Sequence, residues 1–199
     1  MVAGWRYLLG DRALRLLFAN ALLFGSAILM VVPLETVLML NVLHFTPWQY
    51  GLVVGLPCLG GVLGARLSPR LVRRFGIRRV LIGAGIARTP WLLTIPLAGQ
   101  GFGGLVLLST VSFGLLLCAG VFNPAFAAHR MAITREDMMS RVLAGWSVGG
   151  RLTQPFFIAA GGALATVTSL RTAIVVAGIL CVTSIPFLIP RTADVPSYR

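Results

Sequence analysis

Three ionisable side chains lie inside long apolar stretches of this 199-residue chain: Glu35, Arg88 and Arg151. A charged group at the centre of a membrane helix costs about 2.5 to 3.5 kcal/mol, so each of the three predicts a cavity or a partner. A partly buried carboxylate can take up and release a proton, which makes Glu35, just beyond Pro33, a candidate proton carrier. The alternatives are an ion pair between Glu35 and an Arg, a carboxylate near the outer surface, and Arg side chains that snorkel or bind freed carbonyls.

One face of a predicted helix carries Ser147, Arg151 and Gln154, because positions i, i+4 and i+7 align along a helix. We expect this stripe to line a cavity, with Glu35, Arg88, Arg151 and Gln154 on one interior surface directed at a partnering half. Two positive charges and one negative charge on that surface would favour an anionic or zwitterionic substrate.

No pattern typical of catalysis or metal binding accompanies these residues. An intramembrane serine protease needs a His base at membrane depth, whereas His44 and His129 fall in predicted turns. Glu35 is the only acid inside a predicted span, and the three Cys residues lack metal or redox spacing. The sequence therefore predicts no enzyme, no catalytic residue, no metal site and no cofactor.

Composition places the chain in the lipid bilayer. Charged residues make up 11% of the sequence and hydrophobic residues 57%, with a mean hydropathy of +0.91, whereas a soluble domain carries about a quarter charged residues. The net charge of +12 would suggest nucleic-acid binding in a polar chain, but the Arg residues lie at the ends of apolar segments. Membrane topology and anionic headgroups explain them, so we expect no nucleic-acid partner.

Six apolar segments are each long enough to cross the hydrocarbon core, which takes roughly 20 residues. Their approximate bounds are Leu16–Leu40, Tyr50–Leu67, Val80–Leu97, Gly103–Phe126, Val142–Ala165 and Thr172–Ile189. We therefore expect an all-α membrane protein with a six-helix bundle over residues 16–190. An interfacial segment at 1–15 and a tail at 191–199 flank this bundle.

Most of the Arg residues lie in four patches separated by pairs of apolar segments. The patches are Arg6, Arg12 and Arg15; Arg66, Arg70, Arg73, Arg74, Arg78 and Arg79; Arg130, Arg135 and Arg141; and Arg191 and Arg199. The predicted turns on the opposite side hold Arg171 alone. Because basic residues stay in the cytoplasm, this asymmetry predicts that both termini are cytoplasmic.

The second patch resembles a known transporter loop. It begins at Gly64 and continues through Arg73-Arg74-Phe75-Gly76 to Arg78-Arg79, and it looks like the loop between the second and third helices of each half of a major facilitator superfamily transporter, in its second-half form. Ser68 stands where that loop often has an acid. We expect Gly64, Arg73, Arg74, Gly76, Arg78 and Arg79 to form the cytoplasmic loop motif, with a structural or a gating role.

A second stretch strengthens the resemblance. Phe122-Asn123-Pro124, then Ser140-Arg141-Val142, then Pro155 and Gly161-Gly162 follow an order similar to helices ten and eleven of the drug, macrolide and siderophore exporters of that superfamily.

The resemblance implies one half-bundle of the major facilitator fold, a 3+3 inverted repeat. It implies the C-terminal half of a secondary exporter in the plasma or inner membrane, with proton-coupled efflux of a drug-like or siderophore-like small molecule. The family uses twelve helices, so we expect a second six-helix half as partner, from the same chain if it is truncated or from another subunit. The alternative is a non-transporting membrane scaffold, or a truncated half that needs a partner half.

Overall fold

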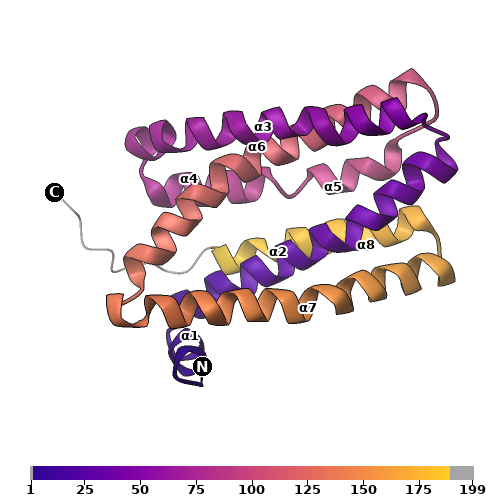
Figure 1. Cartoon of the computed structure of the whole chain (residues 1–199). Helices are drawn as coiled ribbons and strands as arrows, with labels where there is room; N and C mark the ends of the chain where they lie inside the picture. The colour runs from indigo at the N-terminus through magenta and orange to yellow at the C-terminus, as the bar shows by residue number, and fades with distance from the viewer. Residues whose placement is uncertain (1, 189–199) are drawn as a thin grey trace.

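The computed structural model describes residues 2–188 and contains helices but no strand over that range. The α-helices run roughly lengthwise in Figure 1, apart from the short α1 at one end. They are α1 (Val2–Gly10), α2 (Arg12–Val37), α3 (Pro47–Phe75), α4 (Ile77–Ala87), α5 (Trp91–Thr94), α6 (Phe102–Ile133), α7 (Met139–Val167) and α8 (Leu170–Thr183). Short π or 3-10 segments add η1 (Leu38–Val42), η2 (Ile95–Leu97), η3 (Glu136–Met138) and η4 (Ile185–Leu188). The predicted tail at 191–199 lies outside the described residues.

Five helical segments are long and apolar enough to cross a membrane, by length and composition. They are Arg12–Val42, Pro47–Phe75, Ile77–Leu97, Phe102–Ile133 and Leu170–Leu188. The predicted fifth span, 142–165, lies inside α7, which has 29 residues but is not among the five, because Arg151 and Gln154 near its centre lower its hydropathy. The chain is a multi-pass membrane protein, and the sixth span stays a prediction.

Helix pairing follows a three-plus-three pattern. The first unit consists of α2, α3 and α4–α5, and the second unit of α6, α7 and α8. In this comparison α2 corresponds to α6, α3 to α7, and α4–α5 to α8. Under this correspondence the α3–α6 contact matches the α7–α2 contact, the α2–α8 contact matches the α6–α4 contact, and the α3–α4 contact matches the α7–α8 contact. In Figure 1, α3, α4, α5 and α6 form one layer and α2, α7 and α8 the other. The bundle is thus built from two units that pack alike.

Small residues let α3 and α6 approach closely. A Cβ atom on Gly60 would lie 2.7 Å from the Phe113 carbonyl oxygen, and one on Gly64 would overlap the backbone at Leu117. Ser68, one turn further along α3, donates a hydrogen bond of 2.8 Å to the Val121 carbonyl. Gly64 therefore acts as a packing residue, as expected of glycines spaced four apart in a membrane helix.

The turn between α3 and α4 consists of Gly76 alone. Its φ of +82° is a value that side chains with a Cβ rarely adopt, which explains glycine at this position. The turn directs the Arg-rich end of α3 straight into α4.

The third span is not continuous, unlike the predicted segment 80–97. Helix α4 ends at Ala87 with Arg88 as its C-cap, and α5 begins at Trp91 after Pro90. Proline has no N–H to donate and disfavours the helical conformation in the residue before it, so the helix breaks here. The break places Arg88 at a helix end inside the bundle.

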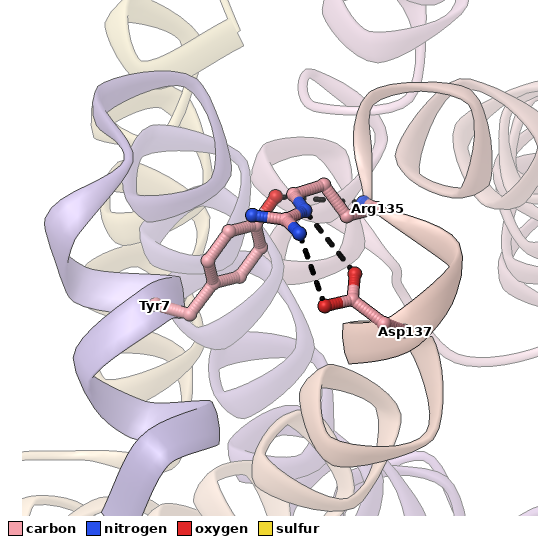
Figure 2. A network of polar contacts seen from close by, with 3 residues as sticks. All are labelled: Tyr7, Arg135 and Asp137. Atoms are coloured by element: carbon pink, nitrogen blue, oxygen red, sulfur yellow. Dashed lines mark hydrogen bonds and ion pairs between the residues drawn. The ribbon is translucent and has the colours of Figure 1, made fainter.

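The N-terminal segment is a helix packed on the bundle. Leu8 of α1 is fully buried against Val142 of α7, and the Arg135 backbone N–H donates to the Tyr7 hydroxyl at 3.4 Å. Figure 2 shows this contact beside the Arg135–Asp137 ion pair. Asp11 then caps α2 by accepting from the Leu14 N–H at 2.9 Å. Helix α1 is therefore tied to α7 and, through Tyr7, to the α6–α7 turn.

Candidate functional site

Glu35 lies in a largely apolar cavity of about 250 Å³ between α2, α3, α5 with η2, and α6. The side chain is half-buried. The other polar lining side chains are Thr36, Tyr50 and Ser112, and the rest are apolar, such as Val53 and Leu115. A carboxylate in such surroundings can take up a proton with little rearrangement, because an apolar site disfavours the charged form of an acid far more than its neutral form.

Glu35 has no Arg partner in residues 2–188, where the one ion pair is Arg135–Asp137 at 3.1 Å. The structural ion pair considered as an alternative is therefore absent from the described chain. Among the described residues Glu35 carries the only charge that lines its cavity, so these residues make the cavity negative or neutral.

Arg88 occupies a different place, deep inside the bundle. The residue is 3% exposed, and its Nη2 donates to Asn20 Oδ1 at 3.0 Å. Asn20 Nδ2 in turn donates to the Ser184 carbonyl at 2.8 Å. These bonds join the end of α4, the first half of α2 and the end of α8.

Aromatic faces and helix ends compensate the buried charge of Arg88. Its guanidinium carbon lies 3.6 Å from the Phe24 ring centre and 3.7 Å from that of Phe122, a geometry that stabilises a cation. Arg88 and Ser184 are also the C-caps of α4 and α8, and helix C-termini carry partial negative charge. Among residues 2–188 the Arg88 Nε atom has no hydrogen-bond partner. Sequence reasoning missed Phe24, Phe122 and Ser184, although Asn20 was a visible polar signal on α2.

The structure does not bring Arg88 to the Glu35 cavity. Arg88 sits at the level of Phe24, and Glu35 lies about 16 Å further along α2 at roughly 1.5 Å per residue. Arg88 does not line that cavity.

Arg151 and Gln154 lie away from the bundle interior. Helix α7 packs through Val142, Gly145, Gly149 and Gly161, which are buried. Arg151 lies roughly 200° around the helix from Gly149 at 3.6 residues per turn, and it is exposed while Gln154 is half-buried. The four predicted pathway residues thus occupy three places: the Glu35 cavity, the buried Arg88 site and the exposed side of α7. Arg88 does not share a surface with Glu35, and a common surface of Glu35, Arg151 and Gln154 toward a partnering half stays a prediction.

The loop motif residues sit at the α3–α4 turn. Arg73 and Arg74 end α3, and Arg78 and Arg79 begin α4, all of them exposed. Basic residues suit a helix C-terminus but oppose the dipole at an N-terminus. The dipole of α4 therefore does not stabilise Arg78 and Arg79. Another contact or the membrane topology must favour their position.

A chain of aromatic rings connects α1 to the Arg88 site. Trp5 contacts Phe18, Phe18 contacts Trp146, Trp146 contacts Phe126, and Phe126 stacks on Phe122, with ring centres 5.0 to 5.8 Å apart. The chain links the docked N-terminal helix to the interior through packing alone.

Comparison with known proteins identifies the family. A family model described as Major Facilitator Superfamily matches residues 16–198. No curated protein and no solved structure gives a significant match. Members of this superfamily are membrane transporters rather than enzymes, and the apolar helices and repeated three-helix packing fit that role. The chain belongs to the Major Facilitator Superfamily.

Proposed function

We propose that this chain is one six-helix half of a proton-coupled exporter, with Glu35 as the proton-carrying residue. The observation that carries the proposal is the apolar cavity of about 250 Å³ in which Glu35 is the only charged lining side chain. A group that alternates between charged and neutral forms in such a site couples the protonation state to the occupancy of the cavity.

The cavity favours a drug-like, largely apolar molecule over an anionic one. The expected preference for anions depended on Arg88 and Arg151 beside Glu35, and neither lines the cavity. Because that positive charge lies elsewhere, the cavity would bind a substrate through apolar contacts and through hydrogen bonds to Thr36, Tyr50 or Ser112. We therefore propose a drug-like substrate ahead of the siderophore-like one that the resemblance also implies.

A second six-helix half is the proposed partner, and α7 presents the surface that supports it. Arg151 near the middle of α7 is exposed, and a charge at membrane depth is costly against lipid but tolerated against protein or water. A second copy of the chain or another subunit would cover this face and complete the pair of bundles that alternating access requires.

The proposed topology has six spans with both termini in the cytoplasm. At about 1.5 Å per residue, the 29 residues of α7 reach roughly 43 Å, more than the hydrocarbon thickness of about 30 Å. In Figure 1, α7 runs the length of the bundle beside α2, and its partner half would shield Arg151.

Reporter fusions test this topology. An enzyme that is active only outside the cytoplasm should be active when inserted near Gly101 or Thr168, and silent near Thr134 or after Arg199. A silent reporter at Thr168 together with an active one after Arg199 would leave α7 on the cytoplasmic side, and the six-span proposal would be abandoned.

Transport itself is tested in inside-out membrane vesicles from cells that produce the chain. With an acidic interior, these vesicles should accumulate a lipophilic fluorescent dye, and a protonophore should abolish the accumulation. A chain that crosslinks to a partner through a Cys placed at Ser147, yet moves no dye and no other small molecule tested, would instead fit the scaffold alternative. Purified protein that transports while monomeric would contradict the need for a second half.

A further inference from the structure

A groove on the side of the α3–α6 pair combines apolar walls with two cationic side chains. Its volume is about 640 Å³, larger than that of the Glu35 cavity. The lining side chains are Leu63, Arg66, Leu67 and Arg70 of α3 and Phe113 and Leu117 of α6. This groove is separate from the site proposed for transport.

The α3 residues that line the groove share one helix face. Positions three and four apart are neighbours on a helix surface, so Leu63, Arg66, Leu67 and Arg70 form a continuous stripe. Leu63 and Leu67 are 47% and 40% exposed, and Phe113 and Leu117 form the opposite wall. The stripe begins with an apolar residue, Leu63, and ends with a charged one, Arg70, on the side of the α3–α4 turn.

The positions of Arg66 and Arg70 along α3 indicate their depth in the membrane. Trp48, 63% exposed, suits a membrane interface at the start of the helix. At roughly 1.5 Å per residue, Arg66 lies about 27 Å and Arg70 about 33 Å beyond Trp48, on either side of the far edge of a hydrocarbon core about 30 Å thick.

Neither Arg has an acidic partner in the described part of the chain, where Arg135 and Asp137 form the one ion pair. Both are exposed. Exposed guanidinium groups at this depth meet the phosphate layer of the bilayer, and Arg binds phosphate through paired N–H donors.

We propose that this groove binds one anionic phospholipid from the leaflet on the side of the α3–α4 turn. Its phosphate pairs with Arg66 and Arg70, and an acyl chain lies along Leu63, Leu67, Phe113 and Leu117. The apolar half of the groove requires an acyl chain, so the occupant is a lipid and not a free phosphate. The lipid fixes the charged end of α3 at the membrane surface, whatever the chain transports.

Lipid binding to the full chain in detergent micelles tests the proposal. Native mass spectrometry would compare phosphatidylglycerol with phosphatidylcholine of the same acyl chains. One phosphatidylglycerol should stay bound under conditions that remove phosphatidylcholine. Because each Arg near an anionic lipid contributes on the order of a fivefold factor, Arg66→Gln should weaken binding about fivefold and Arg66→Gln/Arg70→Gln about thirtyfold.

Arg12→Gln is the matched control, because Arg12 is also an exposed Arg, on α2, and it does not line the groove. It should leave binding unchanged, and an equal loss would mean that general charge, not the groove, attracts the lipid. Leu63→Trp keeps both Arg residues but fills the apolar half, so it should also weaken binding.

Two results would overturn the proposal. One is equal retention of the two lipids by the wild-type chain. The other is displacement of phosphatidylglycerol by glycerol phosphate at the same concentration, which would identify a site for soluble anions. Unchanged helix content by circular dichroism would show that each variant is folded, as expected for substitutions of exposed residues.

Discussion

Replacing Glu35 with Gln is expected to abolish proton-driven accumulation of substrate while leaving substrate exchange intact. Gln has nearly the same shape and still forms hydrogen bonds, but it cannot ionise. Glu35 is the only charged side chain that lines its cavity, so no neighbouring carboxylate there can replace it. Exchange persists because binding and the conformational change do not require a proton to move.

The measurement compares two assays on the same vesicles. Dye accumulation driven by a pH gradient should fall to the level of empty vesicles, whereas exchange of labelled for unlabelled dye should stay within about twofold. Glu136→Gln is the matched control, because Glu136 is an exposed acid in η3 that lies outside the cavity. Accumulation by Glu35→Gln with an unchanged pH dependence would remove the coupling role.

The spans were predictable because lipid imposes simple rules. A helix must be about 20 apolar residues long and basic residues mark its ends, so the predicted segments 16–40, 50–67, 103–126 and 172–189 correspond to α2, α3, α6 and α8. The ends were less predictable, because α3 continues to Phe75, α6 continues to Ile133 and α8 stops at Thr183. Gly60 and Gly64 show the same simplicity in packing, since glycines spaced four apart allow helices to approach.

The direction of each polar side chain was not predictable from its position along a span. Position gives depth in the membrane, whereas direction depends on which face the neighbouring helices cover. For Arg151 a signal was present: Gly145 and Gly149 mark the packing face of α7, so a stripe on the other side had to point outward. For Arg88 the partners come from two distant segments, α2 and α6. Asn20 in turn bonds Ser184, which lies 164 residues away in the sequence. No local pattern connects them.

Asn20→Leu is expected to destabilise the bundle more than Arg88→Met does. Removing the Asn20 amide leaves the buried guanidinium with its aromatic faces but without its hydrogen-bond acceptor, and loss of a partner of a buried charge costs up to about 3 to 5 kcal/mol. Arg88→Met removes the charge itself and fills much of the space between Phe24 and Phe122 with a flexible apolar side chain. What it loses is one charged hydrogen bond, about 1.5 to 3 kcal/mol, and part of the cation–π attraction.

The double variant Asn20→Leu/Arg88→Met shows whether the buried charge of Arg88 is what destabilises Asn20→Leu. If it is, adding Arg88→Met to Asn20→Leu should recover stability, because no buried charge then remains to be satisfied. Unfolding of the purified chain by denaturant in micelles provides the free energies, and Arg151→Met on the exposed side of α7 is the matched control. If Arg88→Met costs more than Asn20→Leu and the double variant recovers nothing, the guanidinium contributes net stability. The aromatic faces and helix ends around Arg88 would then more than offset the cost of burying it.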